Sequence, residues 1–385
     1  MLRLDLHDAV RRVGVEADRR SAEAEVIRRL PDDLAASLVD LGLFRAWVAK
    51  RYGGWELPLT PVLDAIEELS WHDGATGWCA MIGATSSLAC GYLDPAWATE
   101  IYGPHRAVTG GYAMPAVPAR PVEGGLMVSG RWQWGSFSHH CTWLGGGCFI
   151  VDAAGKRAAR EDGVAFPFVF FERSQVTLLD TWRVSGLRGT GSTDYQVTDA
   201  FVPEGRWVEF LGRDPVIDSP LYRFPFIGAL ALGVCSVALG LARRAYDELV
   251  ALAGGKRPAQ SSRTLAERAV VQAQVAEAEA AYRSARALVR EVVAEAWEVA
   301  ASGEPLPPEH RRLIRLAATN ATQRSAYAVD LMYHAAGGSA IHESSPLQRV
   351  WRDVNVVTQH GMVAARTFEP VGRMALGLPT DPTQL

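Results

Sequence analysis

The chain has 385 residues, 48% of them hydrophobic, so it can bury a large core and is long enough for two or three structural units. A formal net charge of -4, with 21% charged residues, leaves no basic face for nucleic acid and no acidic tail. The five cysteines form no CxxC pair, which argues against a disulfide framework or a structural zinc site and favours a reducing compartment.

Neither a signal peptide nor a membrane span is indicated by the hydrophobic pattern. The N-terminus carries a charge every few residues and lacks the apolar segment of a signal peptide. The apolar run GALALGVCSVALGLA (228–242) is shorter than the roughly 18 residues that a membrane helix needs. The sequence therefore predicts a soluble, cytoplasmic protein.

The first hundred residues follow a helical pattern. In EAEVIRRLPDDLAASLVDLGLF (23–44), apolar residues recur every three or four positions up to Gly42. TPVLDAIEELSW (60–71) repeats this spacing after a proline in its first turn. We expect helices and short loops from about 5 to 103.

Strand patterns replace the helical ones from about 107 to 210. Alternating or short apolar runs, separated by Gly, Pro and charged turns, predict five strands. They lie within EGGLMVSGRWQW (123–134), LGGGCFIV (144–151), FPFVFFE (166–172), VTLLDTWRV (176–184) and DYQVTDAFV (194–202).

Helical patterns return at 226. The capping box Thr264-x-x-Glu267 predicts the start of a helix that continues without Gly or Pro to Gly303. Such a helix is roughly 55 Å long, a length that a helix bundle supports. Its alanine-rich faces suit close packing on more than one side, including against another subunit.

Several common catalytic signatures are absent from the sequence. GLRGTGSTD (186–194) lies between predicted strands, so it is neither a dinucleotide-binding GxGxxG motif nor a phosphate-binding Walker loop. There is no GxSxG or HExxH motif, and His342-Glu343 lacks a second metal ligand at helical spacing. Bound NAD, hydrolase chemistry and a metal site are therefore disfavoured.

Five motifs in order along the chain resemble the acyl-CoA dehydrogenase superfamily. They are LFRAWVAKRYGGWELPL (43–59), DGATGWCAM (73–81), GRWQWGSFSHHCTW (130–143), DTWRVSGLRGTGSTDYQVTDAFVP (180–203) and AAGGSAIHESSPLQRVWRDVNVVTQH (335–360). More narrowly, they are similar to its monooxygenase branch, the flavin-dependent oxygenase components of two-component systems.

The resemblance implies an α+β, acyl-CoA dehydrogenase-like fold in three domains. These are an N-terminal helical domain (1–105), a central β-barrel-like domain (106–215) and a C-terminal four-helix bundle (216–385). The superfamily usually forms a homotetramer with flavin between the β-domain and the bundle.

The chemistry of the two branches differs at the residue that faces the flavin. An acyl-CoA dehydrogenase needs a carboxylate to take the α-proton. In the superfamily this base lies shortly after the Arg-Asp pair or on an early bundle helix, and both positions lack an acid here. His360 stands near the first of them, as a histidine does in the monooxygenase branch. An imidazole can hold the oxygenated flavin and exchange a proton, which favours an oxygenase.

The resemblance also implies roles for residues of the strand zone. Ser136 aligns with the hydroxyl that bonds the N5 and O4 edge of the flavin, and Trp134 with the aromatic residue beside the flavin ring. His140 aligns with a histidine on the substrate side. Thr190 and Ser192 contact flavin or the substrate-side loop.

Three positions match residues that hold flavin phosphates or the adenine end across a subunit boundary, namely Arg263, Gly337 and Gly338. Three departures from the family pattern weaken tight FAD retention, since His334 replaces a glutamine, Ala49 a proline and Phe137 a glycine. Loosely held FMN or FAD, delivered by a separate NAD(P)H:flavin reductase, fits these departures better. The absence of an NAD(P)H motif agrees with that division of labour.

A further departure concerns substrate activation. Where the monooxygenase branch often has a histidine, the stretch MIGATSSLAC (81–90) offers only Thr85, Ser86 and Ser87. A phenol-activating histidine is therefore not expected at this point.

Taken together, the sequence predicts a flavin-dependent monooxygenase. It would use reduced flavin and O₂ to hydroxylate, or to N- or S-oxygenate, a small aromatic or heteroatom-bearing substrate, with His360, His140 and Ser136 as catalytic residues. Two alternatives stay open, namely an FAD-dependent acyl-CoA dehydrogenase or oxidase and a non-catalytic scaffold with the same fold.

Overall fold

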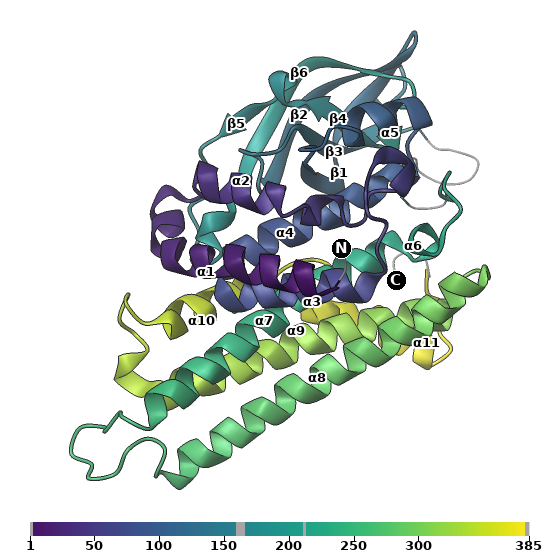
Figure 1. The fold of residues 1–385 in the computed structure, drawn as a ribbon. Coiled ribbons are helices and arrows are strands. Elements are labelled where there is room, and N and C mark those ends of the chain that lie inside the picture. The colour runs from purple at the N-terminus through teal and green to yellow at the C-terminus, as the bar shows by residue number, and fades with distance from the viewer. Residues whose placement is uncertain (1–2, 159–165, 211–212, 382–384) are drawn as a thin grey trace.

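The computed structural model describes residues 3–158, 166–210, 213–381 and 385. Within these described residues, five helices come first, then seven strands, then six more helices. In Figure 1 the strands lie at the top with the fifth helix beside them, the long helices of the C-terminal half lie at the bottom, and the first four helices lie between. The order of helical, strand and helical zones is the one that the sequence predicts; the domain limits at 105/106 and 215/216 stay a prediction.

The helices and strands have the following bounds. The first helices are α1 (Arg3–Ile27), α2 (Asp32–Asp40), α3 (Leu59–His72), α4 (Gly74–Ser86) and α5 (Pro95–Tyr102). The strands are β1 (Thr109–Val122), β2 (Gly125–Gly135), β3 (Trp143–Ile150), β4 (Phe168–Glu172), β5 (Thr177–Leu179), β6 (Thr193–Pro203) and β7 (Trp207–Val208). The last helices are α6 (Pro220–Arg223), α7 (Phe226–Ala253), α8 (Ala269–Ser302), α9 (Pro308–Ala336), α10 (Pro346–Val357) and α11 (Phe368–Ala375).

Short 3₁₀ turns connect several of these elements. They are η1 (Leu43–Arg45), η2 (Lys50–Tyr52), η3 (Ser87–Gly91), η4 (Arg173–Gln175), η5 (Arg188–Thr190), η6 (Gly337–Ser339) and η7 (Ala365–Thr367).

The predicted helical stretch 23–44 is interrupted before it reaches Gly42. Helix α1 ends at Ile27, Arg28 takes a positive φ of 57°, and α2 starts after Pro31. Proline lacks the amide hydrogen that a helix interior needs, so the chain turns here and resumes as a second helix.

The strands form one sheet in the order β5-β6-β2-β1-β3-β4-β7. Strand β1, which the sequence pattern did not predict, lies inside the sheet and pairs in parallel with β3. Its segment TGGYAMPAVPARPV is rich in Gly and Pro, residues that disfavour a central strand. The pairing survives because the register shifts between Tyr112 and Val117, around the first proline.

Helix α8 starts five residues later than its predicted capping box. The Thr264 hydroxyl donates to the Glu267 carboxylate at 3.1 Å, so it is not used to accept a helix amide. The pair instead closes a turn before the helix, which begins at Ala269. The predicted end is confirmed, because Gly303 follows the helix with a φ of 91°.

Helix α7 is the core helix of the bundle and packs against α3, α4 and α9. Over its 28 residues it is long and apolar enough to cross a membrane, with a mean hydropathy of 1.9 in its most apolar window. The helix thus extends well beyond the run 228–242 on which the sequence prediction rested. Since 78% of that window is buried inside the fold, the burial accounts for the composition.

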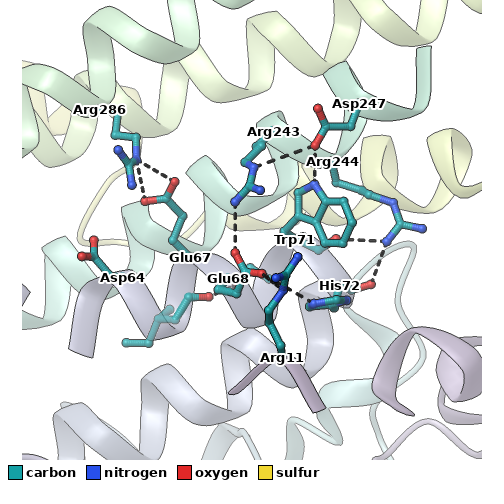
Figure 2. A network of polar contacts seen from close by, with 12 residues as sticks. Arg11, Asp64, Glu67, Glu68, Trp71, His72, Arg243, Arg244, Asp247 and Arg286 are labelled. Carbon is teal, nitrogen blue, oxygen red and sulfur yellow. Dashed lines mark hydrogen bonds and ion pairs between the residues drawn. The ribbon is translucent and has the colours of Figure 1, made fainter. Parts of the chain in front are cut away.

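Helix α3 is joined to the bundle by a polar network (Figure 2). The buried Glu67 carboxylate accepts from Arg286 Nε at 2.7 and 2.9 Å and from the Tyr282 hydroxyl at 2.8 Å. One turn away, Arg290 pairs with Asp64, but these two side chains are 39% and 42% exposed. The Glu67 pair is therefore the one from which water is largely excluded.

The same network continues toward the start of the chain. Glu68 pairs with Arg243 at 3.0 Å and with Arg11 at 3.6 Å, and Trp71 Nε1 donates to Asp247 at 2.7 Å. Three helices, α1, α3 and α7, are thus cross-linked by charge (Figure 2).

Replacing Arg286 tests the buried pair. Arg286→Met leaves the Glu67 carboxylate buried without its cation, so the free energy of unfolding should fall by about 3 kcal/mol. The matched control Arg290→Met removes a cation from the exposed pair on the same helix and should cost less than about 1 kcal/mol. Urea denaturation measures both. Equal losses in the two variants would show that Glu67 is as well solvated as Asp64.

Helix α10 clamps the turn that precedes η5. The Leu187 amide donates to Asp353 Oδ1 at 2.5 Å, and Arg352 Nη1 donates to the Ser185 carbonyl at 2.6 Å. Gly186 allows this approach, because a Cβ there would lie 2.4 Å from the Arg352 carbonyl oxygen. Asp353 is 3% exposed, and burial, reinforced by Asp73, raises the pKa of its carboxyl to about 7.

This raised pKa predicts a pH-dependent stability. A carboxyl with a higher pKa in the folded state stabilises the fold below its unfolded pKa and loses that contribution as pH rises through the folded value. The free energy of unfolding of the wild type should therefore fall between about pH 4 and about pH 7. Asp353→Asn keeps the acceptor for Leu187 and should lack this component, a difference of about 4 kcal/mol for a shift of about three pKa units. Identical pH profiles for the two proteins in urea denaturation would contradict the assignment.

Candidate active site

The end of strand β2 is distorted next to the predicted site. The register with β6 shifts between the pairs Trp132–Tyr195 and Gly135–Thr193, and Trp134, inside this bulge, has a φ of 60°. Bulges re-aim side chains, and here the Trp134 indole is left 56% exposed with its edge contact to Tyr112. Trp132 is fully buried and stacks on Tyr195, so only one of the two tryptophans faces outward.

Three buried hydroxyls form a chain directly after this bulge. Ser136 Oγ lies 2.7 Å from Ser192 Oγ, which lies 2.6 Å from Thr190 Oγ1. Trp78 Nε1 donates to Ser136 at 3.0 Å, and Thr190 Oγ1 donates to the Leu187 carbonyl at 2.9 Å. The structure therefore brings together the predicted residues of the strand end and of the glycine-rich turn.

The direction of this chain is fixed by its two ends. An indole N–H can only donate and a carbonyl can only accept, so each hydroxyl must donate toward Leu187. The Ser136 hydroxyl thus donates a hydrogen bond to Ser192 Oγ and accepts one from Trp78 Nε1, and one lone pair of its oxygen remains available. A ligand at Ser136 meets an acceptor, and aligned hydrogen bonds of this kind polarise one another.

His360 joins the same site through Trp78. Helix α4 carries Trp78 between the sheet and the bundle, and its indole meets the His360 ring edge-on with centroids 5.5 Å apart. The Met362 amide donates to His360 Nδ1 at 3.4 Å. Burial and the nearby Arg315 guanidinium lower the pKa of His360 to about 4. The imidazole is therefore neutral at pH 7, with its proton on Nε2, and can donate a hydrogen bond from there.

His140 lies on the side of the strand end that faces the first helices. Its Nε2 is 3.1 Å from the Leu30 carbonyl oxygen, its Nδ1 is 3.8 Å from Asp32, and its ring packs on Phe137. Burial lowers the pKa of His140. Both ring nitrogens are thus directed to the segment around α2, and the predicted substrate-side role of His140 stays a prediction.

The predicted phosphate or adenine residues lie elsewhere. Arg263 is exposed in the loop between α7 and α8, and Gly337 and Gly338 are exposed at the end of α9. These two connections lie at the same end of the bundle, at the left in Figure 1. This single chain does not bring them to Ser136, so their proposed role depends on a neighbouring copy.

The stretch that lacks the family histidine has no unbonded hydroxyl to replace it. Thr85 Oγ1 donates to the Met81 carbonyl, and Ser87 Oγ donates to the Ala84 carbonyl. Ser86 Oγ donates to the Thr109 carbonyl at 2.6 Å, and the Gly83 carbonyl and Thr109 Oγ1 also lie within hydrogen-bond distance of it. All three hydroxyls are thus hydrogen-bonded to backbone carbonyls.

Two residues of the site escaped the sequence analysis. Trp78 lies in the quoted motif DGATGWCAM, but nothing in the motif indicates that its indole connects Ser136 with His360. Arg315 stands in LIRLAAT (313–319), where an arginine amid apolar residues was the available signal.

The residues present fit the flavin ring that the sequence resemblance implies. A flavin is a planar heteroaromatic system with a polar edge, so it needs an apolar face and hydrogen-bonding groups beside it. Trp134 offers an exposed aromatic face, Ser136 an acceptor at the adjoining position, and His360 a neutral donor across Trp78.

The chain is similar in sequence to known flavin-dependent enzymes. Residues 232–365 match the family model described as "Acyl-CoA dehydrogenase, C-terminal domain". The chain is 34% identical to indole-3-acetate monooxygenase of Pseudomonas putida, over 94% of this chain and 92% of that protein. It is 28% identical to the flavin-dependent monooxygenase, oxygenase subunit HsaA, of Mycobacterium tuberculosis, over 95% of this chain and 94% of that protein.

A solved structure extends the similarity to the fold and the cofactor. XiaF from Streptomyces sp., in complex with FADH2 and glycerol, superposes with a TM-score of 0.90 at 26% identity, covering 99% of this chain and 96% of that chain. The predicted acyl-CoA dehydrogenase-like fold and the reduced flavin cofactor are thereby confirmed. The chain belongs to the flavin-dependent monooxygenase branch of the acyl-CoA dehydrogenase superfamily and is an oxygenase component that uses reduced flavin.

Proposed function

We propose that this oxygenase hydroxylates a small aromatic substrate, with His360 as the hydrogen-bond donor to the reacting atoms. The observation that carries the proposal is the contact of Trp78 with both the His360 ring and the Ser136 hydroxyl. It connects a neutral donor with the predicted flavin edge. The named substrate of the relative from Pseudomonas putida, indole-3-acetate, is aromatic and supports this substrate class.

Reduced flavin, when bound, supplies the electrons that activate O₂. The residues of the chain would position it and exclude water. Ser136, Ser192 and Thr190 are each 4% exposed or less, so their hydrogen bonds lie in a largely water-free environment. His360 Nε2–H would donate a hydrogen bond to the reacting atoms, and the imidazole would stay neutral while it orients them.

The acyl-CoA dehydrogenase alternative needs a carboxylate base in place of His360. Asp353, which lies closest along the chain, points to the Leu187 amide and holds the turn before η5. Because Asp353 is engaged in this hydrogen bond, the oxygenase is favoured over the dehydrogenase.

We further propose that the protein acts in the cytoplasm with a separate NAD(P)H:flavin reductase and as a homotetramer. The name of the relative HsaA, an oxygenase subunit, supports a reductase on another chain. The exposed Val270 at the start of α8 and the exposed Arg263, Gly337 and Gly338 at one end of the bundle support contacts with a second copy.

Replacing His360 tests its role. In a reaction with reduced flavin, O₂ and an aromatic substrate, His360→Ala should lower product formation about 100-fold, because it removes the donor from the reacting atoms. The flavin should still be oxidised, with hydrogen peroxide released in place of product. Product and peroxide are measured together, and His105→Ala, an exposed histidine after α5, is the matched control.

Three outcomes would decide against this function. Unchanged product per flavin oxidised in His360→Ala would remove His360 from the reaction. Reduction of bound FAD by an acyl-CoA in the absence of O₂ would favour the dehydrogenase. A protein that neither binds flavin nor alters the rate of its oxidation would be a scaffold.

The fixed direction of the hydroxyl chain predicts a preference for reduced flavin. Reduced flavin carries an N–H at position 5, whereas oxidised flavin has a bare nitrogen there, and Ser136 presents an acceptor. Ser192→Ala frees the Ser136 proton for donation to oxidised flavin. The dissociation constant of oxidised flavin divided by that of reduced flavin should therefore fall about 5-fold to 10-fold.

Anaerobic and aerobic flavin titrations measure this ratio. Ser129→Ala is the matched control, because Ser129 lies on β2, the strand that leads to Ser136, but its hydroxyl bonds Asp199 at the exposed end. If Ser192→Ala leaves this ratio unchanged, the hydrogen-bonded chain of hydroxyls does not set the preference for reduced flavin.

A further inference from the structure

Arg315 is a buried cation on helix α9, which begins at Pro308. Its side chain is 3% exposed, and its neighbours Ile314, Ala317 and Ala318 are fully buried and apolar. Burial lowers the pKa of the guanidinium to about 10, so it stays charged at pH 7. A charge in such surroundings destabilises the fold unless a partner compensates it.

The described part of the chain supplies Arg315 with little compensation. Nη1 donates to the Met362 sulfur at 3.5 Å, and the buried Nε has no hydrogen-bond partner. Over the described residues, no carboxylate forms an ion pair with it. Two other buried arginines differ: Arg45 donates to three carbonyl oxygens, and Arg244 pairs with both Asp18 and Glu248.

The position of Arg315 connects it with the candidate active site. Met362, which contacts the guanidinium, donates its amide to His360 Nδ1. Arg315 is also close enough to His360 for its positive charge to lower the pKa of the imidazole. A group bound by Arg315 would therefore lie beside the imidazole.

We propose that Arg315 binds a carboxylate of the substrate, so that the enzyme selects aromatic acids over their uncharged analogues. The inference rests on the proposed function of the same site. A guanidinium presents a planar fork of donors that matches a carboxylate, and Nε belongs to that fork. The missing partner of Arg315 is thus an anion that arrives with the substrate and is held next to His360.

The test compares the binding of matched acids and amides with the protein free of flavin. Isothermal titration with indole-3-acetate and indole-3-acetamide, and with the corresponding phenylacetate pair, isolates the contribution of the carboxylate. The wild type should bind the acids more tightly than the amides. Arg315→Met should weaken acid binding at least about 10-fold and leave amide binding within about twofold.

Arg312→Met is the matched control. It removes the same charge three residues earlier on α9, where the guanidinium pairs with Glu309. It should change neither acid nor amide binding. Arg315→Met should also unfold at the same temperature as the wild type or at a higher one, because methionine removes an uncompensated buried charge.

The proposal fails if no acid binds more tightly than its amide to the wild type, or if Arg315→Met weakens both alike. It also fails if Arg315→Met weakens flavin binding and keeps the preference for acids, which would assign Arg315 to the cofactor. These results are separable from a failure of the proposed function, which would show as absent hydroxylation while the titrations still decide the role of Arg315.

Discussion

The hydrogen bond from the Leu187 amide to the Asp353 carboxylate connects the bundle to the sheet at the site. It holds Leu187 in a left-handed conformation, and η5 follows from it. The turn then places Thr190 and Ser192 against Ser136, and the Phe137 amide adds a bond to the Thr190 carbonyl. Without this hydrogen bond, Ser136 and Ser192, which are more than 50 residues apart in the sequence, would not be held next to each other.

Charged side chains occur in two different settings, paired at the helical interface and incompletely compensated around the site. In the network of Figure 2, cations and carboxylates from α1, α3, α7 and α8 compensate one another and stabilise the helical interface. Around the site, Asp353 and Arg315 are buried with incomplete compensation. Such groups weaken the fold and are typical of places where binding or proton transfer is needed.

Much of the fold could be predicted from sequence because the periodicity of apolar residues changes at the right places. Strand β1 could not, since its prolines contradict the local preference and only the register shift against β3 accommodates them. The start of α8 was misplaced because Thr264 and Glu267 satisfy each other rather than the helix.

The candidate site was predictable in its parts and not in its connections. The motifs named Ser136, Thr190, Ser192 and His360, but the hydroxyl chain and its direction depend on tertiary contacts. The indole of Trp78 and the missing partner of Arg315 are likewise properties of the folded chain, and no spacing in the sequence encodes them.

The burial of α7 has a consequence for how the protein is made. Its main bundle partner, α9, ends 83 residues further along the chain, at Ala336. At about 5–20 residues per second, synthesis leaves α7 without that partner for roughly 4–17 s. During this interval α3 and α4, already synthesised, can cover part of its apolar surface. The early helices would thus shield the nascent bundle from aggregation, in addition to carrying Trp78 into the site.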